Sequence, residues 1–116
     1  MERGNCVGKS LTILQHEVDE YISQFQVGYF QPMTLVVRLT EELGELAREI
    51  NHVYGEKPKK QTEPAGDIML ELGDLLFVII CLANSLDIDL TTAHDAVMEK
   101  FGTRDHDRFE RKSKTT

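Results

Sequence analysis

The sequence predicts an all-α protein, built as a bundle of four helices within one domain. Through most of its 116 residues, apolar side chains recur at steps of three and four, the spacing of one helix face. No segment alternates apolar and polar residues with a period of two, so no strand is expected. Breaks that contain glycine and proline separate the helical stretches, and their short length favours neighbouring helices that pack side by side.

The first two helices are expected in the N-terminal half of the chain. Ser10 is predicted to cap the first, whose apolar stripe ends near Phe25. After a break at residues 28–32, a second stripe is expected to start near Thr34 and to stop at Gly55.

The third helix is expected to follow a loop. Residues 55–66 contain two prolines and two glycines, a composition typical of a loop. The helix is then predicted from Ala65 or Asp67 to Leu86.

The fourth helix is expected to complete the single domain. Thr91 is predicted to cap it, and Gly102 to end or kink it. Residues 1–116 are expected to form one domain, of which residues 1–9 and 110–116 are flexible.

Composition places the chain among soluble cytoplasmic proteins. Its net charge of −7 argues against a surface that coats nucleic acid, which needs a basic stripe. Two cysteines, Cys6 and Cys81, make no disulfide framework and favour a reducing cytosol, with Cys81 read as a buried thiol. The first 25 residues show no apolar core of a signal peptide.

Residues 75–83 are apolar throughout. This run of nine is about half the length that a membrane span needs, so it is interpreted as a core helix. A helix that is apolar on every side needs partners all round. One small chain has few helices to offer, so a homodimer or homotetramer is expected.

Two pairs of acidic residues are the main functional signal. Glu42 and Glu45, and later Glu71 and Asp74, stand three residues apart, so each pair shares one helix face. Four carboxylates that meet between packed helices repel one another unless a cation lies among them. Oxygen ligands suit Mg²⁺ or Mn²⁺ rather than zinc, and neither pair has the histidine of a di-iron Glu-x-x-His motif.

Helical angles separate the acids of the second helix. Measured from the centre of its apolar stripe, Glu42 lies at roughly 70°, Glu49 at about 90° and Glu45 at about 130°, while Glu41 points nearly opposite. A single acidic pair on a helix is more often a solvated face than a metal site. Two pairs on neighbouring helices favour the metal site.

The same residues resemble a known signature. Glu41-Glu-Leu-Gly-Glu45 followed by Glu71-Leu-Gly-Asp74 is similar to the EExxE…ExxD motif of MazG-like nucleotide pyrophosphohydrolases, in the all-α NTP pyrophosphatase superfamily. The resemblance extends through Phe77 and covers roughly residues 30–108.

The resemblance implies an activity and a cofactor. A nucleoside triphosphate would be hydrolysed between its α- and β-phosphates, giving a monophosphate and pyrophosphate, often to clear unwanted nucleotides. Mg²⁺ would be held by Glu42, Glu45, Glu71 and Asp74. Glu42 or Glu45 would orient or deprotonate the attacking water, and Glu41 matches the first letter of the motif although its angle points away. The family further implies a dimer or tetramer.

The resemblance also implies substrate contacts. Lys100 and Arg104 match basic positions that bind phosphate, and Phe30 and His52 stand where relatives contact the base, although Phe30 is equally well read as a core residue.

The chain departs from the family pattern at two positions. Cys81 and Met98 stand where many members carry asparagine, which leaves nucleotide preference open. The alternative hypothesis is a catalytically weak helical module that binds nucleotide or protein and keeps the metal site.

Overall fold

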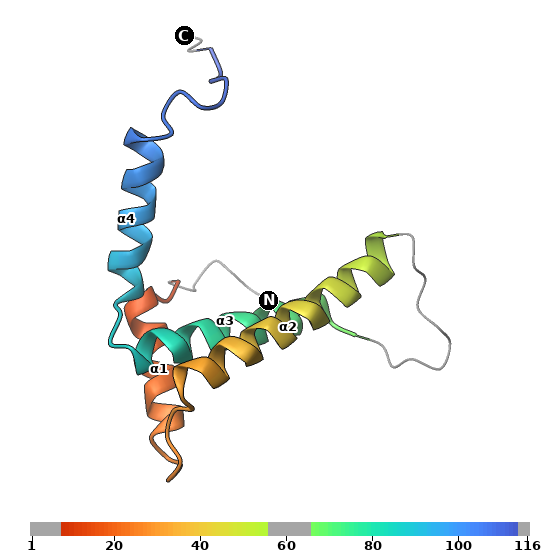
Figure 1. Cartoon of the computed structure of the whole chain (residues 1–116), viewed down its shortest axis with the longest axis vertical. Coiled ribbons are helices and arrows are strands. Elements are labelled where there is room, and N and C mark those ends of the chain that lie inside the picture. Colours follow the sequence, from red (N-terminus) through yellow and green to blue (C-terminus); the bar gives the residue numbers. More distant parts are fainter. Residues whose placement is uncertain (1–7, 56–65, 114–116) are drawn as a thin grey trace.

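A computed structural model describes residues 8–55 and 66–113, and Figure 1 shows its helices. The described residues form four helices and no strand, so the all-α prediction is confirmed. The helices are α1 (Leu11–Ile22), α2 (Pro32–Tyr54), α3 (Ile68–Ser85) and α4 (Leu90–Thr103). Most of the predicted loop, residues 1–7 of the first predicted flexible end and residues 114–116 of the second lie outside the described residues.

Helices α2 and α3 lie side by side and run in opposite directions, while α1 crosses the end of α3 (Figure 1). The core lies where these three helices meet, and its buried members are Val18, Leu35, Val78, Ile80 and Cys81, each 9% exposed or less. Cys81 is therefore the buried thiol that the sequence predicts. Burial raises its pKa, and the nearby charge of Arg38 opposes that effect only in part.

The first three helix starts follow from local chemistry. The Ser10 side chain accepts a hydrogen bond from the Ile13 backbone N–H at 3.2 Å, as an N-cap does. Helix α2 starts at Pro32, two residues before the predicted start, because proline has no N–H to leave unsatisfied in a first turn. The Asp67 carboxylate caps α3 by accepting from two backbone N–H groups.

The predicted cap of α4 is wrong. Asp89, not Thr91, is the N-cap, and its carboxylate accepts from the Thr91 backbone N–H at 3.3 Å and the Thr92 hydroxyl at 2.8 Å. Aspartate accepts more strongly than threonine, and it stands directly before the first helical residue. Helix α4 also continues through Gly102 to Thr103.

A polar network joins α1 to the ends of the other helices. The Asn84 amide donates to the Tyr29 hydroxyl and to the Gln15 carbonyl, both at 2.9 Å, and the Tyr29 hydroxyl donates to Asp19 at 2.9 Å. The Gln15 side chain bonds Asn84 at 2.8 Å and accepts from the backbone N–H of Leu90 at 2.9 Å. Burial is the main cause that raises the pKa of Tyr29 to about 12, so Tyr29 stays a neutral donor.

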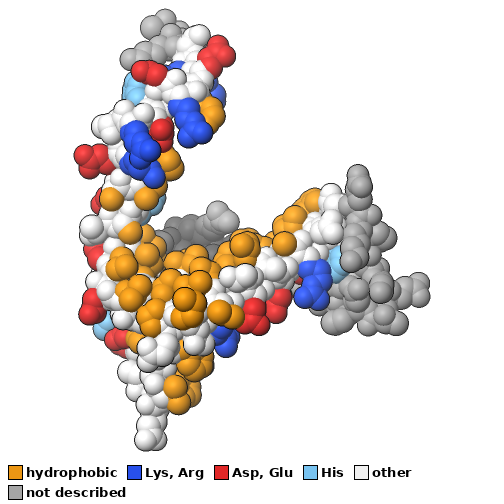
Figure 2. All heavy atoms as spheres, viewed as in Figure 1, with side chains coloured by type: hydrophobic (Ala, Val, Ile, Leu, Met, Phe, Trp, Pro, Cys, Tyr) orange, Lys and Arg blue, Asp and Glu red, His pale blue; other side chains and the backbone are white. Residues whose placement is uncertain are grey.

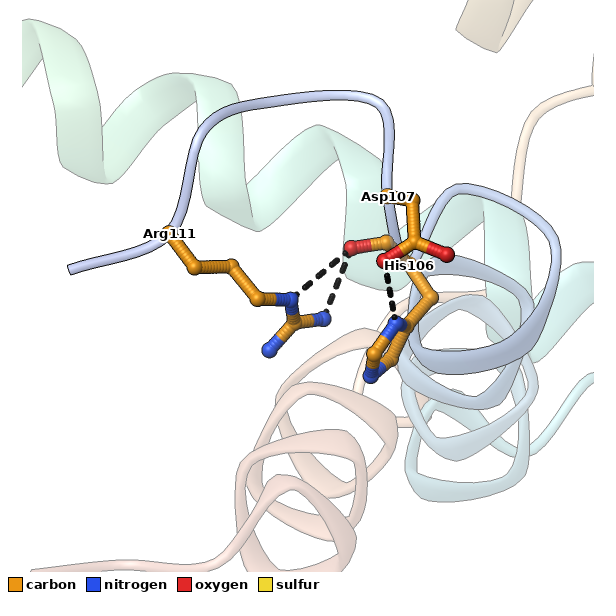
Figure 3. Close-up of polar contacts among 3 residues, drawn as sticks. All are labelled: His106, Asp107 and Arg111. Atoms are coloured by element: carbon orange, nitrogen blue, oxygen red, sulfur yellow. Dashed lines mark hydrogen bonds and ion pairs between the residues drawn. The ribbon is translucent and has the colours of Figure 1, made fainter. Parts of the chain in front are cut away.

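Helix α4 projects away from the α1–α3 unit (Figure 1). The main contacts of α4 are with α1, and residues 94–104 are all exposed. Beyond the helix, Arg111 donates two hydrogen bonds to the His106 carbonyl, and the His106 ring bonds Asp107 at 3.0 Å (Figure 3). The radius of gyration is 18.5 Å, whereas a compact domain of this length has about 13 Å.

Apolar side chains cover much of the visible surface (Figure 2). The buried residues of α3 all lie in its C-terminal half, whereas Met69, Leu70 and Leu72 near its start are 71%, 60% and 51% exposed. As a whole, α3 is as long and as apolar (mean hydropathy 1.9) as a helix that spans a membrane. The core helices of soluble proteins can have the same length and hydropathy. Because it carries Glu71 and Asp74 and packs against α1 and α2, it is the central helix of this unit.

Candidate metal centre and substrate site

Helix α2 presents a row of polar side chains along one edge of its contact with α3. Glu42, Glu45, Glu49 and His52 stand at steps of three and four residues, so they share a face. The antiparallel α3 brings Glu71 of its first turn to the same place.

Three carboxylates converge there. One oxygen from each of Glu42, Glu45 and Glu71 lies within 4.8 Å of the others. Glu42 and Glu71 are half-buried, and in each of them Oε2 is buried without a hydrogen-bond partner among the residues that the structure describes. Buried carboxylate oxygens that nothing satisfies are costly, and a hard divalent cation is the ligand that such oxygens fit.

The electrostatics of this group favour a cation. Burial raises the pKa of Glu42 first, and the charges of Glu45, Asp74 and Glu71 raise it further. Burial, Glu45 and Asp74 raise the pKa of Glu71 in the same way. Within residues 8–55 and 66–113, no lysine or arginine forms an ion pair with the three converging carboxylates.

Asp74 and Glu41 differ in their relation to this group. Asp74 is exposed and lies outside the set of three, but its charge acts on both Glu42 and Glu71, so it borders the group. Its role as a fourth ligand stays a prediction. Glu41 is exposed and lies outside the set, as its helical angle predicts.

Glu49 is a neighbour of this group that sequence reasoning left out. Its side chain is 14% exposed, and its charge helps to raise the pKa of Glu71. One oxygen lies 3.9 Å from His52 Nδ1, and the His52 side chain is only 5% exposed. Gly66 lies so close that a Cβ there would overlap the Glu49 carboxylate. The helical angles of α2 could have predicted this position, because Glu49 lies closer to the apolar stripe than Glu45 does.

A cavity of about 310 Å³ continues the seam toward the start of α2. Its wall is mostly apolar and includes Phe30, Phe77 and Cys81, with Arg38 as its charged member. The Arg38 guanidinium lies 5.8 Å from the centre of the Phe30 ring. Arg38 is one helical turn before Glu42, so the cavity adjoins the carboxylates.

Within a single chain, the residues predicted to bind the substrate do not all lie close together. Phe30 and His52 stand at opposite ends of α2, about 30 Å apart along the helix, too far for both to touch one base. Lys100 and Arg104 lie on the projecting part of α4, away from the α2–α3 seam (Figure 1). The carboxylates and the Phe30 cavity are therefore the parts that a single chain assembles.

Known proteins share this sequence and fold. A profile of the MazG nucleotide pyrophosphohydrolase domain matches residues 30–109. YpjD of Bacillus subtilis (strain 168), named an uncharacterized protein, is 62% identical over 104 residues, which cover 90% of this chain and 94% of that protein.

Two crystal structures match the fold closely. That of YPJD from Bacillus subtilis, provisionally described as a pyrophosphatase, has a TM-score of 0.76 and 60% identity, and covers 84% of this chain and 100% of that chain. The structure of the Bacillus-conserved MazG protein, described as a nucleotide pyrophosphohydrolase, has a TM-score of 0.73 and 56% identity. The match covers 85% of this chain and 96% of that chain. On these matches, this chain belongs to the MazG nucleotide pyrophosphohydrolase family, a class of hydrolases that act on pyrophosphate bonds.

Proposed function

We propose that this protein is a Mg²⁺-dependent nucleoside triphosphate pyrophosphohydrolase, for which Mn²⁺ can substitute. It converts a ribo- or deoxyribonucleoside triphosphate into the monophosphate and pyrophosphate, and removes unwanted nucleotides from the cytoplasmic pool. The observation that carries the proposal is the convergence of Glu42, Glu45 and Glu71, two of which have a buried oxygen with no hydrogen-bond partner in the described part of the chain.

The metal would be held by Glu42, Glu45, Glu71 and Asp74. When bound, it supplies positive charge that neutralises the phosphate oxygens and favours the hydroxide form of a coordinated water. The charges that raise the pKa of Glu42 and Glu71 support this assignment, because a cation relieves the same repulsion.

A carboxylate that the metal leaves free would act on water. Glu42 or Glu45 accepts a proton from the water whose oxygen attacks phosphorus, while the bond to the bridging oxygen breaks and pyrophosphate leaves. Glu45 is exposed and so reaches solvent water, whereas Glu42 is half-buried against α3.

The base would occupy the cavity beside Phe30. Its aromatic wall offers a stacking surface, and Arg38 offers donors between the cavity and the carboxylates. With the base there, His52 lies at the phosphate end of the seam, beyond Glu49. Lys100 and Arg104 would bind the phosphates.

A homodimer or homotetramer is the proposed working form, because α3 and α4 expose so much apolar surface. The second candidate function is a catalytically weak module that binds nucleotide or protein. The observation in its favour is the distance of Lys100 and Arg104 from the carboxylates of their own chain.

The test is incubation with each canonical (d)NTP and a set of damaged ones, with Mg²⁺, followed by separation of the products. Pyrophosphate and monophosphate are expected, and Glu71→Gln is expected to abolish both. Glu41→Gln, which removes an acid just outside the group, is the matched control and is expected to stay active. Release of orthophosphate alone, or no product from any nucleotide, would refute the enzyme. Nucleotide binding without turnover would support the second candidate.

A further inference from the structure

The cavity beside Phe30 has room for a nucleobase rather than for a whole nucleotide. Its volume of about 310 Å³ is at the lower end of the range for small-molecule sites. Leu35, Val78 and Cys81 form its buried floor, each 4% exposed or less. Arg38 also lines the cavity but is exposed, so its guanidinium lies on the side of the cavity that faces solvent.

The side chains that line this cavity offer hydrogen-bond donors and almost no acceptors. Arg38 carries five N–H donors and no acceptor. Tyr29 is also in the wall, but its hydroxyl is already bonded to Asp19 and Asn84, neither of which lines the cavity. The Cys81 thiol is only a weak acceptor, and the other lining side chains are apolar. A ligand group that donates hydrogen bonds therefore finds no strong side-chain acceptor here.

The Arg38 guanidinium is available to a ligand. Arg38 stands one turn before Glu42, at the i, i+4 spacing of an ion pair, but the described part of the chain shows no ion pair between them. The guanidinium lies instead 5.8 Å from the centre of the Phe30 ring, and its charge acts on the Cys81 thiol in the cavity floor. Arg38 thus presents a fork of N–H donors beside the cavity.

Nucleobases differ in the groups that they present to such a wall. A carbonyl oxygen accepts from a guanidinium, and in 6-oxopurines O6 and N7 together accept from both arms of the fork. An exocyclic amine carries N–H donors, which meet the donors of Arg38 with no acceptor between them. An unpaired polar group is costly to bury, so such an amine weakens binding. Adenine, cytosine and guanine carry an exocyclic amine, whereas hypoxanthine, uracil and thymine carry carbonyl oxygens and no amine.

We propose that this cavity selects nucleotides whose base carries a carbonyl oxygen and no exocyclic amine, with Arg38 as the specificity-determining residue. The proposal deepens the proposed function and rests on it for the place of the base. Hypoxanthine and uracil are the bases that adenine and cytosine become when hydrolysis replaces their amine by a carbonyl. The cavity therefore separates a deaminated base from its parent by the one group in which they differ.

The first test compares matched nucleotides on the wild-type protein with Mg²⁺. In ITP and UTP a carbonyl replaces the amine of ATP and CTP, and ITP differs from GTP by the 2-amine alone. In each of the three pairs, kcat/KM is expected to favour the nucleotide without the amine by about 5- to 100-fold. Equal values within the pairs, or a preference for the amine, would overturn the proposal.

The second test assigns the selection to Arg38. Arg38→Met keeps a long side chain but removes the donors, so the ITP-to-ATP and UTP-to-CTP ratios of kcat/KM are expected to fall about tenfold, through slower turnover of ITP and UTP. Arg48→Met is the matched control, because Arg48 is an exposed arginine of α2 that does not line the cavity, and both ratios are expected to stay unchanged. If Arg38→Met slows all nucleotides by the same factor, the guanidinium binds the phosphates and its role in base selection is refuted.

Binding of inert analogues separates this proposal from the proposed function. The α,β-methylene analogues of ITP, GTP and ATP cannot release pyrophosphate, so calorimetry with Mg²⁺ measures their binding alone. The ITP analogue is expected to bind about 5- to 100-fold more tightly than the other two. A protein that turns over no nucleotide but binds the analogues in this order would refute the enzyme and support the selective cavity. Equal binding of the three, or none, would refute the selective cavity, whatever the turnover.

Discussion

At the scale of the residue, the buried oxygens of Glu42 and Glu71 predict how single substitutions change stability. Each glutamine variant removes one charge from the group, so the metal-free protein is expected to melt a few degrees higher than wild type. The same variant loses a ligand, so the increase in Tm that Mg²⁺ gives the wild type is expected to vanish. Thermal melts with EDTA and with Mg²⁺ measure both effects, and Glu41→Gln is expected to match wild type in each.

The same carboxylates predict how stability depends on pH. The pKa values of Glu42 and Glu71 are raised above 4.5, so in the metal-free protein the folded state binds more protons than the unfolded state above that pH. Their stabilising contribution is full below pH 4.5 and is lost as pH rises through the raised pKa values. We expect the Tm difference between wild type and the Glu42→Gln/Glu71→Gln double variant to widen with pH in EDTA, with wild type the less stable. A difference that narrows over that range would contradict this assignment.

The three converging carboxylates could be predicted from the sequence, because helical spacing determines the side of a helix on which a residue lies. It placed Glu42, Glu45 and Glu71 correctly beside one seam. It could not fix the relative heights of α2 and α3, which depend on how the two helices pack. Asp74 lies outside the set of three although its charge acts on Glu71, so its role as a ligand stays a prediction, and Glu49 was left out although its charge also acts on Glu71.

At the scale of the element, periodicity predicted all four helices, but capping chemistry decided where they start. Asp89 caps α4 and the side chain of Thr91 does not. We expect Asp89→Ala to lower the free energy of unfolding by about 1 kcal/mol, the usual cost of a lost cap. Thr91→Ala is expected to change it little. Urea unfolding of both variants measures the difference, and equal losses would favour the threonine cap instead.

The network around Asn84 predicts a larger effect, since it joins α1, α3 and the turn before α2. Asn84→Ala removes its bonds to Tyr29 and Gln15 and leaves partly buried polar groups without partners. The expected loss is about 1–3 kcal/mol in the free energy of unfolding. Asn51→Ala, at an exposed position of α2, is the control and is expected to lose far less. No periodic pattern marks such a network, because its members are far apart in sequence.

At the scale of the whole molecule, the sequence predicted a bundle, while the structure holds α1, α2 and α3 together and lets α4 project. The 18.5 Å radius of gyration and the exposed apolar residues have one physical origin, which is that the helices of the described residues are too few to cover α3 and α4. The apolar run at 75–83 signalled this shortage. It could not show that α4 stands apart, because the direction of α4 depends on its contacts with α1 and on what covers its other side.

Because the described helices leave the apolar face of α4 uncovered, we expect self-association to depend on that face. Phe101→Asp places a charge at the centre of that face, and a charge that has to be buried opposes association strongly. We expect light scattering after gel filtration to show the wild type as a dimer or tetramer and the variant shifted toward monomer, with a lower and concentration-independent Tm. Glu99→Ala alters the opposite side of α4 and is expected to keep the wild-type mass. If Phe101→Asp keeps the full oligomer, the contacts between chains lie elsewhere, on the exposed side chains of α2 and α3.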